Sequence, residues 1–100
     1  MARKQDKLTK AAKMQECQVQ LFPYCNMNPE TTIFAHANSE SKGIALKSEN
    51  WWGSFCCSDC HDILDGKRQT EITKLELNQA FMRGIHRTLK IQIELGNIKI

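Results

Sequence analysis

Cysteine usage is the feature that most restricts how this chain can fold. The chain has 100 residues and five cysteines. A domain of this length has a small core and often needs a disulfide, a metal ion or a partner chain for stability. Cys57 and Cys60 form a C-x2-C knuckle, and Cys17 and Cys25 form a looser C-x7-C pair around a proline-containing turn. Because four thiolates from two such knuckles complete a tetrahedral Zn²⁺ site, these four cysteines predict a structural zinc ion.

The alternative is that the cysteines are simply small, buried hydrophobic residues. We interpret the fifth cysteine, Cys56, in this way, because Cys57 and Cys60 make the better knuckle. The N-terminus is charged and no apolar segment follows it, so we expect no signal peptide. The chain would then stay in a reducing compartment, where structural disulfides are disfavoured.

The positive charge is concentrated at the N-terminus. Of the net charge of +3, all is contributed by residues 1–16, since the remaining residues carry equal numbers of basic and acidic side chains. Such an arm suits an anionic partner, and DNA is the first candidate. A solvated, frayed terminus is the alternative. The basic residues of the arm are Arg3, Lys4, Lys7, Lys10 and Lys13. The longest apolar run is far shorter than the ~20 residues of a membrane span, so we expect no membrane partner.

The order of the expected elements predicts an α+β fold. Expected strands cover residues 17–21, 31–35 with His36 at the end, and 51–57, with a bulge at Gly53. Expected helices cover residues 8–14, 59–65 after an N-cap at Ser58, and about 71–95 after Thr70. Gly66 and Gly96 should end the last two helices. This gives a basic arm over residues 1–16 and one domain over 17–100, with the zinc-stabilised core at 17–66.

Two histidines and an asparagine follow one another in the order typical of a ββα-metal (HNH-like) nuclease. The spacing is His36-x13-Asn50-x10-His61, with one histidine on a strand and the other beside the C-x2-C knuckle. Hydrolysis of a phosphodiester needs an activated water, so His36 is expected to act as the general base. Asn50 would orient its imidazole. Taken singly, each residue is more simply explained as a satisfied polar group or a turn former.

A catalytic divalent cation is expected beside the scissile phosphate, where negative charge develops. His61 would hold this ion, which we take to be Mg²⁺ or a related cation. Asp65 lies four residues later, on the same helix face, and its carboxylate suits Mg²⁺ as a second ligand. Arg83 and Arg87 on the long helix are expected to contact phosphates together with the N-terminal arm.

Several short segments resemble the small lambdoid phage and prophage proteins of the YbcO type, which are regarded as HNH-like nucleases. The similar segments are Glu16–Val19, Cys25–Asn26, Asn28–Thr31, Ala35–His36 and Cys57–Asp62. The resemblance extends from about Leu8 to the tail at residues 96–99. It implies a ββα-metal core with a C-terminal helix, acting in DNA metabolism in the cytoplasm of a bacterial host cell.

The resemblance implies zinc at Cys17, Cys25, Cys57 and Cys60, and an active site around His36, Asn50 and His61. Many nucleases of the broader HNH group carry Asp or His directly before the catalytic histidine, as a metal ligand. This chain has Ala35 there, so Asp65 or a loop residue must replace that ligand for activity.

Two other functions remain open from the sequence. The chain could be a non-catalytic, zinc-stabilised DNA-binding or adaptor protein, which needs the four cysteines but gives the histidines no role. It could also be an interaction module whose long apolar helix pairs with a partner, for example in a homodimer.

Overall fold

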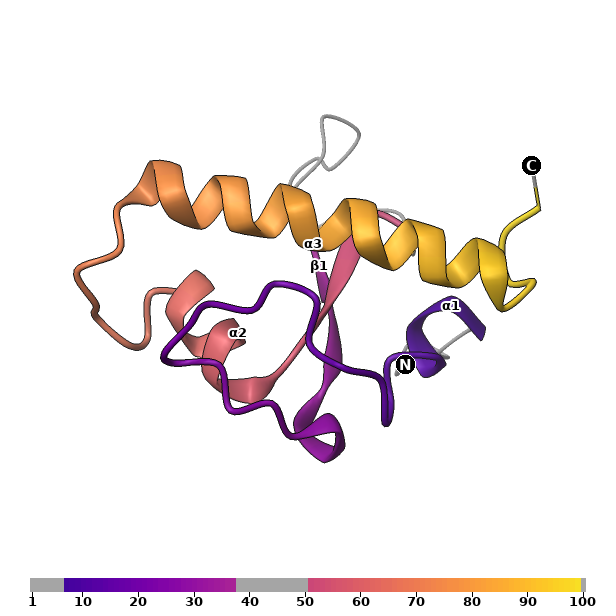
Figure 1. Cartoon of the computed structure of the whole chain (residues 1–100), viewed down its shortest axis with the longest axis horizontal. Coiled ribbons are helices and arrows are strands. Elements are labelled where there is room, and N and C mark those ends of the chain that lie inside the picture. Colours follow the sequence, from indigo (N-terminus) through magenta and orange to yellow (C-terminus); the bar gives the residue numbers. More distant parts are fainter. Residues whose placement is uncertain (1–6, 38–50, 100) are drawn as a thin grey trace, which may run out of the picture.

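The structure, a computed structural model, describes residues 7–37 and 51–99 and is a small α+β fold (Figure 1). A two-stranded sheet and a long C-terminal helix account for most of its regular structure. The elements in chain order are α1 (Lys7–Lys10), the 3-10 helix η1 (Pro29–Thr31), β1 (Ile33–His36), β2 (Gly53–Cys56), α2 (Ser58–Leu64) and α3 (Lys74–Glu94). The predicted Asn50 lies outside the described residues.

The strands form an antiparallel pair that the long helix covers. His36 of β1 pairs with Gly53 of β2, and Ile33 pairs with Cys56. Every residue of β2 is buried, because α3 runs across it (Figure 1). An isolated hairpin is marginally stable in water, so this cover is what makes the pair stable. Gly53 pairs in regular register and forms no bulge, contrary to expectation. A side chain there would collide with the carbonyl of Ala35.

Helix α3 contacts β2 through small and hydroxyl-bearing residues. The Thr88 hydroxyl accepts a hydrogen bond from the Phe55 amide (3.0 Å) and donates one to the hydroxyl of Ser54 (3.4 Å). A Cβ atom at Gly84 would lie 2.5 Å from Ser54 Oγ and 3.0 Å from Val19 Cγ2. The absence of a side chain at Gly84 therefore lets the helix backbone approach the strand.

Both helix starts differ from the prediction. The N-cap of α2 is Cys57, not Ser58, and its sulfur accepts a hydrogen bond from the Cys60 amide at 3.4 Å. Helix α3 begins three residues later than expected. Its cap is Thr73, which accepts from the Glu76 amide (3.1 Å) and donates to the Glu76 carboxylate (3.0 Å). Thr73 is thus the N-cap of α3, and Glu76 three residues later is the acidic partner that Thr70 lacks. Gly66 and Gly96 follow their helices with φ of 80°, as predicted.

The strand expected at residues 17–21 is absent. Cys17, Val19 and Leu21 are buried, so the apolar alternation was real. However, the Gln20 amide donates to the sulfur of Cys17 and the Leu21 amide donates to that of Cys60, both at 3.4 Å. These amides are therefore unavailable to a sheet.

Part of the predicted basic arm packs on the folded domain. Ala12 is buried, and the Gln92 side chain of α3 donates a hydrogen bond to the Leu8 carbonyl at 2.7 Å. Figure 1 shows α1 beside the C-terminal end of α3. Within residues 7–37 and 51–99, no helix has the length and apolar character needed to cross a membrane.

Candidate functional site: a four-cysteine centre beside a two-histidine pocket

The two cysteine pairs meet in one buried cluster. The sulfur atoms of Cys17, Cys25, Cys57 and Cys60 all lie within 4.8 Å of one another. All four cysteines are buried and none forms a disulfide. In a tetrahedral ZnS₄ site with Zn–S bonds of about 2.3 Å, neighbouring sulfurs are about 3.8 Å apart. The Cys25 and Cys57 sulfurs are separated by 3.8 Å, so the cluster can hold a zinc ion.

The backbone around the cluster is arranged to support thiolates. The residue three positions after Cys17 donates its amide to that sulfur, and the residue three positions after Cys57 does the same, each at 3.4 Å. The Leu21 amide donates to Cys60 at 3.4 Å and so links the two knuckles. Amide donors directed at sulfur favour the thiolate form, which is the form that binds metal.

The cysteines cannot all ionise without a compensating cation. Hydrogen bonds from Cys56 and Cys60 lower the pKa of Cys17. The Cys17 thiolate, by accepting those bonds, raises the pKa of Cys60 and of Cys56. Burial raises the pKa of Cys25 to about 12. A bound dication would offset these mutual effects and permit four thiolates in one buried space.

The fifth cysteine, Cys56, is not one of the four possible metal ligands, although its thiol contacts Cys17. Cys56 is the last residue of β2, pairs with Ile33 and is completely buried in the core. This is the packing position expected for it.

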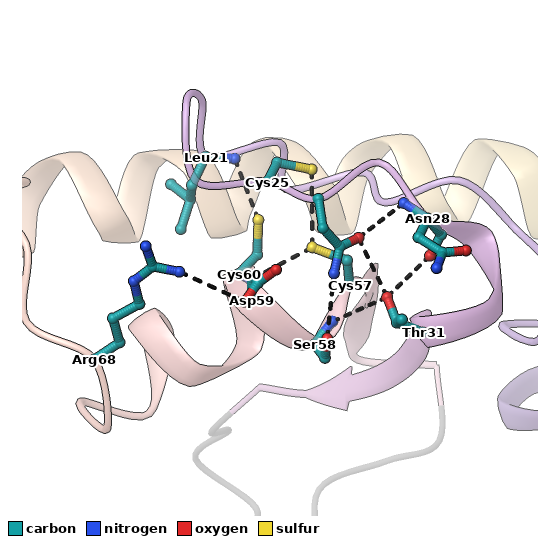
Figure 2. A network of polar contacts seen from close by, with 10 residues as sticks. Leu21, Cys25, Asn28, Thr31, Cys57, Ser58, Asp59, Cys60 and Arg68 are labelled. Carbon is teal, nitrogen blue, oxygen red and sulfur yellow. Dashed lines mark hydrogen bonds and ion pairs between the residues drawn. The ribbon is translucent and has the colours of Figure 1, made fainter.

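Side chains near the Cys17–Cys25 pair form hydrogen bonds with the start of α2. The Asn26 amide group donates to the Ser58 hydroxyl at 3.2 Å, and the Thr31 hydroxyl donates to the Asn26 carbonyl oxygen at 3.3 Å. The Ser58 amide donates to Thr31 at 3.4 Å. Figure 2 shows this network beside the sulfurs of Cys25, Cys57 and Cys60. Helix α2 is thus attached to the first cysteine pair both through the cysteine cluster and through these polar bonds.

One pocket contains both histidines of the predicted constellation. Its volume is about 540 Å³, and His36, His61 and Asp65 all line it. His36 is the last residue of β1, and His61 directly follows Cys60 on α2. The remaining lining residues come from α2, the loop after it and the first turns of α3: Ile63, Leu64, Gly66, Arg68, Gln69, Thr70, Ile72, Lys74, Leu77, Asn78 and Phe81, with Ala35 from β1.

Each imidazole has a contact that restricts its orientation. The His36 ring lies 5.0 Å from the Phe34 ring, centroid to centroid, in an edge-on arrangement. His61 Nδ1 lies 3.5 Å from Asp65 Oδ2. A partner at Nδ1 leaves Nε2 of His61 as the nitrogen available to a ligand. The His61 side chain is 29% exposed and lines the pocket.

The predicted nucleic-acid contacts have varied environments. Arg83 donates to the Val19 carbonyl at 3.3 Å, and Arg87 donates to Gln18 and Gln20. Both guanidinium groups therefore hold the segment that follows Cys17, and their contact with DNA stays a prediction. Lys7, Lys10 and Lys13 are exposed. Arg3 and Lys4 lie outside the described residues.

Sequence analysis missed the basic side chains of the pocket itself. Arg68 and Lys74 line it although they are far from His36 in sequence. Arg68 lies 5.0 Å above the Tyr24 ring, and its Nη1 is 3.5 Å from Asp59 Oδ1. The Tyr24 hydroxyl donates to Glu71 at 2.5 Å, which raises the pKa of Tyr24 and lowers that of Glu71. The basic residues after Gly66 were the available signal, but the loop has no periodicity that would place them.

Comparison with known proteins identifies relatives over almost the whole chain. Residues 6–97 match the family model described as "Putative nuclease YbcO". Proteins carrying that same description in Escherichia coli K12 and in Enterobacteria phage 82 are each 34% identical over 93 residues, covering 92% of this chain and 96% of the relative. A solved structure, described as a putative bacteriophage protein from E. coli K-12 MG1655, superposes with a TM-score of 0.75 at 32% identity, covering 89% of this chain and 99% of the other. The chain therefore belongs to the YbcO family.

Proposed function

We propose that the protein is a metal-dependent nuclease that hydrolyses DNA phosphodiester bonds in the two-histidine pocket. The observation that carries this proposal is that His36 and His61, from different elements, line one pocket beside a four-cysteine centre. The description of the family as nucleases supports the same reaction. Zinc in the cysteine centre would be structural, because all four sulfurs are buried and serve as its complete ligand set.

His36 is assigned as the general base. An imidazole titrates near neutral pH and is the usual side chain for taking a proton from an attacking water. Its place at the end of β1, against the Phe34 ring, holds it at the pocket wall. Asn50 is assigned to the orientation of this imidazole, as in the HNH-like layout.

His61 and Asp65 are assigned to the catalytic cation. His61 lines the pocket, and its Nδ1 lies 3.5 Å from Asp65 Oδ2. Asp65 can thus serve as a second ligand or hold the His61 ring in place. A divalent ion bound there would stabilise the charge that develops on the phosphate and the leaving oxygen. Ala35 also lines the pocket, but its side chain has no atom that could bind a cation. His61 and Asp65 are therefore the residues assigned to cation binding.

A cleavage assay with histidine variants tests this assignment. Purified, zinc-loaded protein is incubated with duplex, branched and single-stranded DNA in Mg²⁺, Mn²⁺ or no added cation. We expect cation-dependent cleavage by the wild type and at least a ~100-fold loss in His61→Ala.

The third histidine provides the control. His86 is exposed on α3 and does not line the pocket, so His86→Ala should cleave like the wild type. Equal background activity in all three proteins, with every cation and DNA form, would exclude a nuclease and favour the non-catalytic DNA-binding or adaptor function.

A further inference from the structure

The ionisable groups of the pocket are divided between its walls. β1 and α2 supply His36, His61 and Asp65, whereas the loop after α2 and the start of α3 supply Arg68 and Lys74. The imidazoles and the carboxylate suffice for the proposed hydrolysis. Arg68 and Lys74 are positively charged and lie on other elements, and the proposed hydrolysis gives them no role. Their charge identifies them as binding groups for an anion.

The pocket is larger than one phosphate requires. Its volume of about 540 Å³ lies within the ~300–1,000 Å³ typical of small-molecule sites, which hold ligands of nucleotide size. A segment of nucleic acid entering it would therefore bring more than the scissile phosphate into contact with its walls.

Arg68 is held in place before any ligand arrives. Its guanidinium lies over the Tyr24 ring. Figure 2 shows the guanidinium near the carboxylate of Asp59, which lies between Cys57 and Cys60 in the sequence. Only Nη1 is used in the contact with Asp59, at 3.5 Å, and the group has five N–H donors. The arginine side chain is 46% exposed, so donors remain accessible to a phosphate, which arginine can bind with two parallel hydrogen bonds.

Lys74 adds a second cation to the same wall. It is the first residue of α3 and is exposed, and none of the carboxylates of the described residues forms an ion pair with it. We propose that Arg68 and Lys74 form a second phosphate subsite, which binds the backbone phosphate adjacent to the one being hydrolysed. This inference rests on the proposed function and specifies its substrate as a polynucleotide and not a single phosphodiester.

Binding measurements test the subsite without requiring catalysis. The His36→Ala protein is titrated with an oligonucleotide between about 50 and 200 mM salt. We expect Arg68→Gln and Lys74→Gln each to weaken binding about three- to tenfold at the lower salt, and to reduce the slope of log K against log salt by about 0.7–0.9. The matched control is Lys67→Gln, which removes the same charge one residue away from Arg68 but outside the pocket lining. If Lys67→Gln weakens binding equally, the loss of affinity reflects the lower net charge of the protein, and the proposed subsite is wrong.

A substrate comparison separates this inference from the nuclease assignment. Bis(p-nitrophenyl) phosphate has one phosphate and cannot occupy an adjacent subsite. We expect Arg68→Gln to reduce kcat/KM for the oligonucleotide at least about fivefold more than for this small diester. An equal loss on both substrates would mean that the cations act on the reacting phosphate and would overturn the inference. Absence of hydrolysis of either substrate by the wild type would instead reject the nuclease assignment, and the binding titration would still decide the subsite.

Discussion

At the scale of single residues, Cys56 and Cys57 are neighbours with different environments. Cys57 belongs to the four-sulfur cluster, whereas Cys56 packs in the core. We predict that Cys57→Ala loses bound zinc and unfolds, because structural zinc contributes about 10–16 kcal/mol and a domain is stable by only about 5–15 kcal/mol. Cys56→Ala should keep one zinc per chain and lose only about 1–2 kcal/mol of packing. Metal analysis measures the zinc content of each variant, and circular dichroism measures its folding. Zinc retained in Cys57→Ala would contradict the assigned ligand set.

Asp65 gives a second residue-level prediction. Its carboxylate lies 3.5 Å from His61 Nδ1, whether it binds the catalytic cation directly or orients the ring. Asp65→Asn should therefore weaken activation by Mn²⁺ about 10–100-fold, with the zinc content unchanged. Asp62, which does not line the pocket, is the matched control in the form Asp62→Asn. An unchanged Mn²⁺ dependence in Asp65→Asn would exclude both roles.

At the residue scale, the sequence predicted which cysteines cluster and which histidines share a pocket, while the chemical roles of these residues stay predictions. The C-x2-C and C-x7-C spacings identified the four clustered cysteines, because metal ligation limits which residues can meet. The proximity of His36 and His61 followed from the order of the motifs. Arg68 and Lys74 could not be predicted, because their place in the pocket depends on the path of an irregular loop.

At the scale of elements, the contact between α3 and β2 determines where the hairpin lies. A Cβ at Gly84 would lie 2.5 Å from the buried Ser54 hydroxyl. We predict that Gly84→Ala destabilises the protein by about 1–3 kcal/mol through overpacking, although alanine is intrinsically favoured over glycine in a helix by about 1 kcal/mol. Gln79→Ala, at an exposed position of the same helix, should be nearly neutral. Denaturant unfolding measures both changes, and a stabilised Gly84→Ala protein would contradict the observed packing.

Element boundaries were predicted less well than element types. The hairpin, α2 and α3 were all expected, but α3 starts after its N-cap Thr73, and residues 17–21 form no strand. In the latter segment the alternation of apolar residues correctly indicated burial. The prediction failed because amides at Gln20 and Leu21 bond to cysteine sulfur, and periodicity carries no information about which acceptor an amide will find.

At the scale of the whole molecule, the described part of the basic arm (residues 7–16) and the pocket lie toward opposite ends of α3. Asn78 lines the pocket and Gln92 contacts Leu8, and these positions are separated by about 21 Å along the helix at ~1.5 Å per residue. That distance corresponds to about six base pairs at ~3.4 Å each. DNA long enough to reach both regions is therefore needed before the arm can contribute.

This separation predicts a dependence on DNA length. Lys7→Gln combined with Lys10→Gln should weaken binding of a duplex of about 20 base pairs roughly tenfold, and binding of a hairpin of about four base pairs less than twofold. Lys90→Gln with Lys99→Gln, at other exposed positions, controls for net charge. Equal losses on the long and short DNA would show that the arm does not bind as a distant contact.

The predicted homodimer would form through exposed apolar residues of α3. Leu75, Met82 and Ile93 are exposed there. Dimerisation through this helix stays a prediction, which sedimentation at several protein concentrations would decide.

The nuclease proposal requires that an imidazole in the pocket beside the four-cysteine cluster activates water for DNA hydrolysis. Its most direct test is the single-turnover rate of DNA cleavage in Mg²⁺ or Mn²⁺ by zinc-loaded wild-type protein and by His36→Ala, with zinc content measured on the same samples. We predict a loss of about 10²–10⁴-fold in His36→Ala at unchanged zinc content. Equal cleavage rates in the two zinc-loaded proteins would contradict the claim.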